Sequence, residues 1–456
     1  MAPRLNFPVH VGRPELVRPE TTTPREFKYL SNIDDQIGLR NHLPFVHFYP
    51  PNKASPAQDP VVMIKEALAK VLVYYYPVAG RLRNSDKGKL VVDCCDEGVV
   101  FREANADITI GQLQGMDGGL KPPFPMWDQL LVDDIWGSYL ITDSPLLHMQ
   151  VTRLACGGFV LAYTFNHCIC DAYGAYLFMT TLSEFCLNPN RQSPSRLPSW
   201  GREILKPRTP PILSYPHPEY DVPHHPSITF TRTDFKRLAQ TSIFFSTSNI
   251  CALKNQLNDQ KTSTYHAVAS CLWRARTRTL LKPNSVTRFL IPVDTRFQYK
   301  PSLPKGYYGS ALVFPCAISK ADELVGKPLG YAVSLISEAK RGVMGDEHRA
   351  SVLDFIEVNG RRGFCTDGTY VVSDMSRLKF AHIDFGWGPG LFGGVARAGT
   401  GPAPGLLTPI VGYKNEKGVE GVLALVSLPL ESVDRFHMEV RKEIDSATSL
   451  KPRSAL

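Results

Sequence analysis

The chain has 456 residues, more than one hydrophobic core ordinarily supports, so two domains are expected. With 43% hydrophobic and 21% charged residues, it is neither a disordered nor a collagen-like chain. Its net charge of +8 is spread along the sequence, which favours small anionic partners over nucleic acid. Apolar runs fall short of the roughly 18 residues of a membrane helix, and the N-terminus lacks the apolar region of a secretory signal.

A helix is predicted after an extended, proline-punctuated N-terminal stretch. Asp59 is suited to cap this helix, and Pro60 fits its first position. Apolar residues then recur at the helical spacing until Pro77 ends the run. Two short runs suited to strands follow, at 90–93 and 99–103. The turn residues between them predict that the two strands pair as a hairpin.

A largely apolar segment comes next. Strands are predicted over 146–153 and 158–165, with a glycine-containing turn between them. The second run is nearly all apolar, which is typical of a strand that is buried on both faces. A helix is predicted to begin near Asp171 and to continue to about Phe185.

A proline-rich stretch then divides the chain. Nine prolines lie between Pro194 and Pro226, so an extended crossover is expected over residues 193–228. It would separate an N-terminal domain, 1–192, from a C-terminal domain, 229–456, with a late segment of the second free to pack against the first. Three histidines of this stretch are interpreted as part of a solvated linker and not as a metal site: His217, His224 and His225.

The second half again mixes strands and helices, so the fold class is α/β. No glycine-rich phosphate loop follows a predicted strand, so neither a nucleoside triphosphatase nor a dinucleotide-binding domain is indicated. Strands are predicted at 243–246, 288–292, 311–315 and 421–428. Helices are predicted at 249–257, 265–278, 330–341 and from about 431 onward.

His167 and Asp171 form the chemically informative pattern. His167 stands at the end of the buried strand, and such a strand end usually opens into a cleft because the chain must leave the sheet there. Histidine is the side chain best suited to accept a proton near neutral pH. Asp171 can cap the following helix, or it can anchor the turn by pairing with a distant arginine. From these two residues alone, a core histidine beside a capping aspartate is an equally good interpretation.

Two cysteines beside His167 raise the alternative of a zinc site. Such a site would need His167, Cys168 and Cys170 to converge, but alternate residues on a short turn diverge and no fourth ligand is near in sequence. Most of the ten cysteines lie in apolar segments, as is typical of buried free thiols in a reducing compartment. No metal is therefore predicted.

A second motif, late in the chain, favours a catalytic His167 over a core histidine. The segment Asp384-Phe385-Gly386-Trp387-Gly388, together with His167-xxx-Asp171, resembles the hallmark motifs of the plant BAHD acyl-CoA-dependent acyltransferases, in their usual order and separation. The resemblance covers essentially the whole chain and is most detailed for the alcohol acyltransferases that include benzyl alcohol benzoyltransferases. It also extends to four shorter segments, 34–36, 75–82, 150–153 and 306–309.

This resemblance implies two chloramphenicol-acetyltransferase-like domains, each a mixed sheet with flanking helices, and a solvent channel between them. His167 would deprotonate the alcohol as it attacks the thioester carbonyl of an acyl-CoA. No covalent enzyme intermediate is then needed, so a nucleophilic Cys168 stays a remote alternative. Asp171 would point away from His167 and pair with an arginine of the second domain, for which Arg296 is the match. The Asp384–Gly388 motif would be chiefly structural, and its two glycines suit a sharp turn.

The resemblance also implies which segments bind CoA. Four departures from the family weaken any claim about CoA geometry, and none touches His167. Ser310 stands where asparagine is usual, and Pro389 where lysine is common. Arg361-Arg362-Gly363 replaces a Gly-Arg-Pro pattern in part, and His266 stands where an acidic residue is frequent. The residues expected to contact CoA are Thr262, Ser263, Thr264, Tyr308, Gly309, Ser373 and Asp374.

The expected function is therefore acyl transfer from an acyl-CoA to an alcohol, giving an ester. No arginine marks a pocket for a carboxylate acceptor, and the aromatic segments 44–49 and 122–127 favour a neutral alcohol, with benzoyl-CoA or a short acyl-CoA as donor. The same two segments are equally well interpreted as core. The alternative acceptors are an alkaloid or terpenoid hydroxyl, or an amine. A non-catalytic homologue that binds a metabolite is a different class, which the intact His167 disfavours.

The expected working form is a cytoplasmic monomer. Acyl-CoA would be its co-substrate, and no permanently bound cofactor or metal is expected. Neither a membrane nor a nucleic acid is predicted as a partner.

Overall fold

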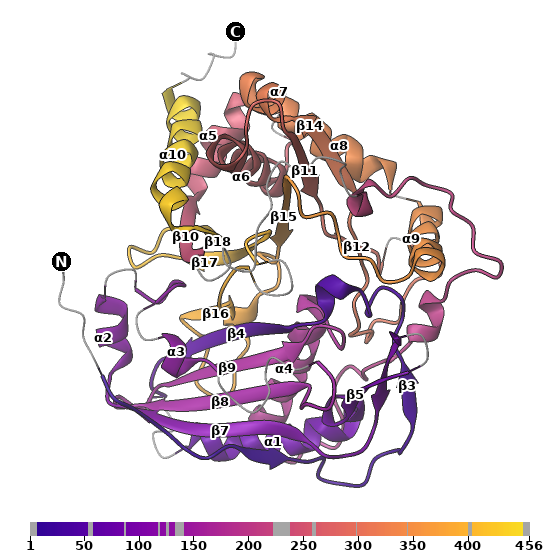
Figure 1. Ribbon diagram of the computed structural model, residues 1–456. Coiled ribbons are helices and arrows are strands. Elements are labelled where there is room, and N and C mark those ends of the chain that lie inside the picture. Colours follow the sequence, from indigo (N-terminus) through magenta and orange to yellow (C-terminus); the bar gives the residue numbers. More distant parts are fainter. Residues whose placement is uncertain are drawn as a thin grey trace. The chain divides into compact units, whose positions relative to one another are not determined.

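In the computed structural model, the chain forms two compact units that alternate along the sequence (Figure 1). The first comprises Met1–Pro207, Pro301–Ala311 and Leu378–Arg397, and the second comprises Arg208–Lys300, Leu312–Arg377 and Ala398–Leu456. The structure describes residues 7–52, 58–85, 88–116, 119–124, 127–132, 141–221, 238–257, 261–297, 299–343, 345–399 and 404–449.

The boundaries of these units differ from the predicted ranges 1–192, 193–228 and 229–456, for which the sequence analysis allowed a late segment to pack against the first domain. The first stretch of the first unit runs to Pro207, through part of the proline-rich crossover. Two later segments, Pro301–Ala311 and Leu378–Arg397, belong to the same unit. The second of them carries the Asp384–Gly388 motif. It joins because Phe392–Val395 pairs antiparallel with a strand at Phe45–Phe48, which extends the first sheet at its edge.

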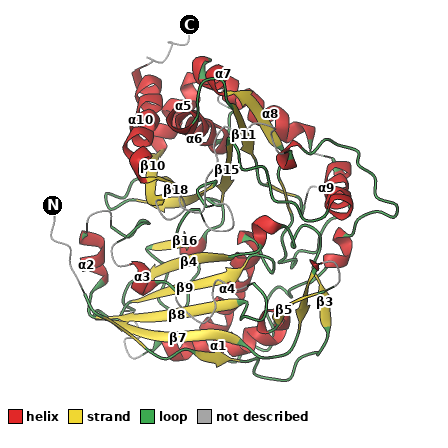
Figure 2. Cartoon of the chain, viewed as in Figure 1, coloured by secondary structure: helices red, strands yellow, loops and turns green. Residues whose placement is uncertain are grey.

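A mixed seven-stranded sheet forms the centre of the first unit among the described residues, in the order β1-β7-β8-β9-β4-β16, with β2 also paired to β7. Helices α1 and α4 pack against each other, and α1 also packs on β8 (Figure 2). The described strands of the first unit, which include β3, β5 and β6 of a separate three-stranded sheet, are β1 Val9–Val11, β2 Glu15–Val17, β3 Phe27–Tyr29, β4 His42–Tyr49, β5 Arg81–Asn84, β6 Leu90–Asp93, β7 Val99–Ala106, β8 Leu147–Leu154, β9 Phe159–Asn166 and β16 Phe392–Val395. The helices are α1 Pro60–Tyr74, α2 Ile110–Gly115, α3 Trp127–Leu130 and α4 Ala172–Leu187.

Strand β9 is buried along its whole length, as its sequence predicts. It lies between β8 and β4, and both pairings are antiparallel. Every one of its eight residues is buried because neighbours cover both faces. The strand therefore has one fixed place in the sheet, and its last residue, Asn166, delivers the chain to His167.

Helix α1 begins where the sequence predicts, since the Asp59 carboxylate accepts a hydrogen bond from the amide of Val61 (3.0 Å) and Pro60 occupies the first turn. The predicted hairpin is wrong. Strand β6 pairs with β3 and β5 in a separate three-stranded sheet, whereas β7 pairs with β1, β2 and β8. The connection turns sharply, with positive φ at Asp96 (54°) and Gly98 (90°), so the two strands part instead of pairing.

The second unit is also built on a mixed sheet, of six strands among the described residues, in the order β10-β18-β17-β15-β11-β14. Its strands are β10 Leu238–Ser246, β11 Val286–Leu290, β12 Val293–Asp294, β13 Leu312–Val313, β14 Cys316–Lys320, β15 Thr369–Asp374, β17 Leu407–Lys414 and β18 Glu420–Pro429. Its helices are α5 Thr247–Gln256, α6 Thr264–Leu280, α7 Ala321–Gly326, α8 Leu329–Gly342, α9 Asp346–Asn359 and α10 Val433–Ser449.

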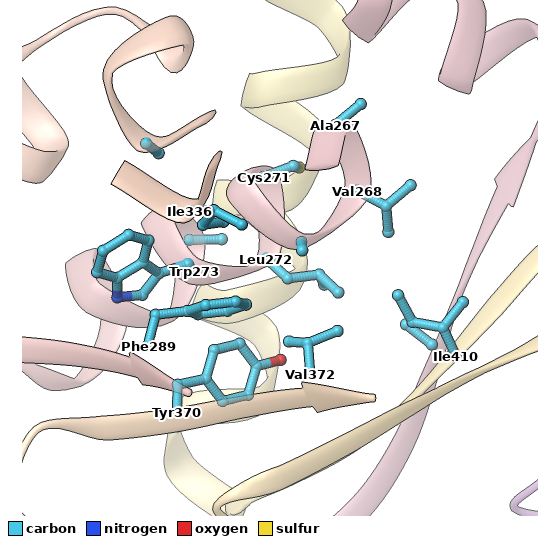
Figure 3. Close-up of a cluster of buried hydrophobic side chains, with 14 of the residues drawn as sticks. Ala267, Val268, Cys271, Leu272, Trp273, Phe289, Ile336, Tyr370, Val372 and Ile410 are labelled. Carbon is cyan, nitrogen blue, oxygen red and sulfur yellow. The ribbon is translucent and has the colours of Figure 1, made fainter. Parts of the chain in front are cut away.

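Helix α6 forms the centre of the second unit's core. Figure 3 shows three aromatic rings packed between this helix and the sheet: Trp273 contacts Phe289 at a tilt, and Phe289 meets Tyr370 edge to face. Neighbouring α6 side chains, including Leu272, are fully buried in the same cluster. The indole N–H of Trp273 donates to Thr287 Oγ1 (2.8 Å), so the polar atom of this large ring is satisfied within the core.

The proline-rich crossover holds two short 3₁₀ turns, at Arg202–Leu205 and Pro218–Tyr220, and is otherwise irregular where it is described. The interpretation of His217 as part of a solvated linker is wrong. Its ring is buried and hydrogen-bonded to Glu219 Oε1 (3.0 Å) and to Ser351 Oγ (2.9 Å), so it anchors this stretch to the second unit. His224 and His225 lie outside the described residues.

No helix of the described residues is long and apolar enough to cross a membrane.

Candidate active site

His167 is positioned by the end of β9 and by a tight turn. The main-chain amide of His167 donates to Asn41 O (2.8 Å). The side-chain oxygen of Asn166 accepts a hydrogen bond from the amide of Cys168 (3.1 Å), and the main-chain carbonyl of Asn166 accepts one from the amide of Ile169 (3.0 Å). Asn166 thus turns the chain out of the sheet, and His167 is fixed at the start of that turn.

The surroundings of His167 favour the neutral ring. Burial lowers the pKa of His167, and this effect outweighs the opposing influences of its own main-chain carbonyl, Asp171 and Asp34. Nδ1 is buried and makes no hydrogen bond of ordinary geometry among the described residues. The residue as a whole nevertheless keeps partial solvent exposure. A neutral imidazole at pH 7 is the form that can accept a proton.

Asp171 caps helix α4, as one of its two predicted roles requires. Its Oδ1 accepts from the amide of Gly174 (3.0 Å), and the side chain is buried. Arg296 lies in the second unit, where its amide and its Nη1 both bond to Asp294 Oδ1 (2.9 and 3.1 Å). The pairing of Asp171 with Arg296 stays a prediction.

Cys168 has the properties of a core thiol. It is fully buried, and its Sγ donates to Leu39 O (3.5 Å). Burial raises the pKa of Cys168 well above its ordinary value, so the thiolate needed by a nucleophile or a zinc ligand is disfavoured. No group of three potential metal ligands is found in the part of the chain that the structure describes.

A buried ion pair that the sequence analysis missed supports the His167 turn. Arg202 Nη2 donates to Ile169 O (2.6 Å), inside the segment between His167 and Asp171. Arg202 Nε lies 3.4 Å from Asp34 Oδ2, and both side chains are almost completely buried. The guanidinium also packs over the Trp200 ring, with Cζ 3.7 Å from its centroid. One arginine therefore holds the turn against two other segments of the chain.

Asp34 extends this support to a third segment. Its Oδ1 accepts from the amide of Ser310 (2.8 Å), and its Oδ2 accepts from Ser31 Oγ (2.6 Å). Burial raises the pKa of Asp34, but Arg202 and these donors oppose that rise. Burial likewise works against charge on Arg202, yet Asp34 brings the net pKa of the arginine upward. We interpret the pair as ionised.

Two glycines allow the close approach of these segments. A Cβ on Gly174 would lie 1.9 Å from Tyr308 O, so helix α4 and the Tyr308–Gly309 turn touch backbone to backbone. A Cβ on Gly309 would lie 2.6 Å from Arg202 Cζ. The predicted CoA-binding turn is thus packed directly against the helix that starts at Asp171. The small Ser310, where the family usually has asparagine, leaves its Oγ buried without a partner among the described residues.

The Asp384–Gly388 motif is a turn organised by its own aspartate. Asp384 Oδ1 accepts from the amides of Gly386 (2.7 Å) and Gly388 (2.8 Å). Both glycines have positive φ, 99° and 78°, which other residues rarely adopt. Phe385 and Trp387 are buried, and Trp387 packs edge-on against Phe159.

This motif lies at the opposite end of β9 from His167. Trp387 contacts Phe159, the first residue of the strand, whereas His167 follows the last. Seven residue steps at about 3.3 Å each separate the two ends by roughly 23 Å. The geometry therefore fits the structural role that the resemblance implies for the motif.

The predicted CoA contacts of the second unit come together at one end of α6. Ser263 caps this helix by accepting from the amide of His266 (3.2 Å). Tyr265 OH donates to Val372 O (3.0 Å), which places Thr262–Thr264 beside Ser373–Asp374 at the end of β15. The third predicted contact, Tyr308–Gly309, belongs to the first unit.

The aromatic segment at 44–49 is core. Within β4, Phe45 and Phe48 are fully buried; Phe45 stacks on Tyr163, and Phe48 packs edge-on against Phe124. Of the second aromatic segment, the structure describes the side chains up to Phe124, which is buried too. These side chains therefore support the sheet, and they do not argue for an apolar acceptor pocket.

Comparison with known proteins places the chain in a family. A family model described as the Transferase family matches residues 7–442. The chain belongs to this family. Its resemblance to the BAHD acyltransferases is confirmed, and the protein is an acyltransferase.

Two curated relatives show how far this acyltransferase's similarity extends. It is 40% identical to the benzyl alcohol O-benzoyltransferase of Petunia hybrida over 445 residues, 97% of this chain and 94% of the relative. It is 43% identical to the 13-hydroxylupanine O-tigloyltransferase of Lupinus albus over 471 residues, 100% of this chain and 99% of the relative. Among solved structures, vinorine synthase matches with a TM-score of 0.70 at 21% identity, covering 95% of this chain and 98% of that one, which confirms the fold.

The Arg202–Asp34 pair gives a stability prediction. Arg202→Met leaves Asp34 buried without its counter-charge, so we expect the free energy of unfolding to fall by about 3–5 kcal/mol. The measurement is chemical denaturation followed by tryptophan fluorescence. The double variant Asp34→Asn/Arg202→Met removes both charges and should be less destabilised than Arg202→Met alone. A single variant as stable as the unmodified acyltransferase would contradict the ion pair.

Proposed function

We propose that this acyltransferase esterifies a neutral alcohol with the acyl group of an acyl-CoA, and that His167 is the general base. The observation that carries the proposal is the neutral, partly exposed imidazole held at the end of β9 by a fixed turn. The named activities of the Petunia and Lupinus relatives, both O-acyltransferases, support the same reaction class.

The reaction needs one group that takes and returns a proton. His167 accepts the hydroxyl proton through Nε2 as the alcohol oxygen attacks the thioester carbonyl carbon. The carbon–sulfur bond then breaks, and the CoA thiolate takes the proton back from the imidazolium. The main-chain carbonyl of His167 favours a proton on the ring. We assign that proton to Nδ1, the nitrogen nearer the main chain, which leaves Nε2 as the base.

The other candidate residues are assigned supporting roles. Asp171 caps α4 and is proposed to pair with Arg296, which would hold the turn from a second direction. CoA is proposed to contact Thr262, Ser263, Thr264, Tyr308, Gly309, Ser373 and Asp374. The support is that the residues of this set in the second unit gather at one end of α6, while Tyr308 packs against Gly174 of α4 and Gly309 lies against Arg202.

Two substrate classes have specific support. A benzoyl or short acyl donor with a neutral alcohol follows the benzyl alcohol O-benzoyltransferase relative. An alkaloid hydroxyl as acceptor is the second candidate, and the 43% identity to 13-hydroxylupanine O-tigloyltransferase over the full chain favours it. Esterification of a hydroxyl group is common to both candidates.

We also propose that the protein works as a monomer in the cytoplasm and needs no metal. All ten cysteines are free thiols, as is usual in a reducing compartment. The chemistry assigned to His167 calls for no cation.

The general base gives the first prediction of function. His167→Ala should lower the turnover of acyl-CoA by a factor of about 10² to 10⁴, because the alcohol is a poor nucleophile until it loses its proton. Release of free CoA thiol is measured with a panel of acyl-CoAs and alcohols. His10→Ala changes an exposed histidine of the same unit and should leave turnover unchanged. If His167→Ala keeps more than a tenth of the activity and melts normally, the base has been assigned wrongly.

The acceptor class is tested by direct competition. With benzyl alcohol and shikimate at equal concentration, we expect the benzyl ester to form far faster, because a buried carboxylate without a counter-charge is costly to desolvate. Products are separated and quantified by mass spectrometry. A preference for shikimate would reject the neutral-alcohol proposal while leaving acyl transfer intact.

A further inference from the structure

Helix α6 carries two arginines, Arg274 and Arg276, that are buried to the same degree but differ in their hydrogen bonds. Arg274 is fully paired: Nε donates to Glu443 (3.0 Å), Nη1 donates to the carbonyls of Leu324 (2.5 Å) and Lys327, and Nη2 donates to that of Val325 (3.2 Å). Arg276 makes no hydrogen bond or ion pair with any residue that the structure describes, and its Nη1 is fully buried. Its side chain is only 6% exposed.

The unpaired guanidinium of Arg276 is charged at neutral pH. Burial lowers its pKa to about 10, and the only opposing influence is Tyr370, whose ring centroid lies 4.7 Å from Cζ. A cation held in a protein interior is ordinarily matched by an anion or by hydrogen-bond acceptors. Arg276 has the face of the Tyr370 ring beside it, and its buried Nη1 has no acceptor among the described residues.

Arg276 borders a small, partly enclosed cavity. The cavity has a volume of about 20 Å³, which suits one small ion or one to two waters. No carboxylate side chain contributes to its lining. The cavity is lined by Trp273, Arg276, Thr277, Leu280, Leu281, Thr287, Thr366, Gly368, Thr369 and Tyr370.

Three of the threonine hydroxyls in the lining are already hydrogen-bonded. Thr287 Oγ1 accepts from the Trp273 indole N–H (2.8 Å), donates to Gly368 O (3.3 Å) and lies 3.3 Å from Thr277 Oγ1, and Thr369 Oγ1 donates to Asp367 O (3.4 Å). Thr366 is exposed and stands where the cavity meets solvent. The lining thus combines one fixed positive charge, whose buried Nη1 lacks a partner among the described residues, with an opening that an ion can enter.

We propose that this cavity binds a small monovalent inorganic anion, of the size of chloride, against the guanidinium of Arg276. The anion would supply the counter-charge that Arg276 lacks and would tie α6 to the start of β15. The site is separate from the predicted CoA contacts: Thr264 begins α6, and Arg276 lies twelve residues further along it, roughly 18 Å away. The proposal does not depend on the acyl-transfer chemistry.

The test measures the melting temperature of the full-length protein in sodium chloride and in sodium gluconate at the same total ionic strength. Gluconate is too large for the cavity and serves as the reference anion. We expect the melting temperature to rise by a few degrees with chloride and to saturate, because a ligand that binds only the folded state stabilises it by mass action. Arg276→Met should abolish this chloride response. Arg341→Met removes an exposed arginine of the same unit and should keep it.

A chloride response that is equal in all three proteins, or absent from the unmodified protein, would overturn the proposal. Crystals soaked in sodium bromide give a second measurement that needs no variant. An anomalous peak beside Arg276 Nη1 is expected, and density there without anomalous signal would mean that water alone fills the cavity.

Discussion

The ion pair between Arg202 and Asp34 is the interaction on which the rest of the candidate site depends. It lies in the interior of the first unit, where separating the charges would cost several kcal/mol. Through it, the turn after β9, the stretch around Trp200 and the segment at Ser310 hold one another in place. A general base must be held within fractions of an ångström, and a buried charge pair with fixed hydrogen bonds meets that need better than a surface loop does.

The proposed base and the Asp384–Gly388 turn lie at opposite ends of one strand of the first sheet. His167 follows the end of β9, whereas the Asp384–Gly388 turn packs at its beginning. The late segment returns to the first unit because β16 completes an edge of its sheet beside β4. Substitutions in the turn should therefore act on the stability of the sheet.

The sequence predicted what depends on local pattern. The apolar run of β9, the cap at Asp171 and the start of α1 at Pro60 follow from neighbouring residues, and the structure confirms them. The sequence analysis missed the ion pair between Arg202 and Asp34, because the two residues are far apart in the chain and nothing local marks them as partners. The hairpin at 90–103 was wrong for a related reason, since strand propensity does not say which sheet a strand joins. The pairing of Asp171 with Arg296 and the CoA contacts stay predictions.

The most direct test of His167 as a neutral base is the pH dependence of kcat/KM, which reports the ionisation of the free enzyme. The base acts only when it is unprotonated, and burial lowers its pKa below the ordinary histidine value of 6.5. Activity should therefore be constant through neutral pH and fall only in more acidic solution, with a midpoint below 6.5. A midpoint at or above 6.5, or the same acid limb in a His167→Ala variant, would contradict the assignment.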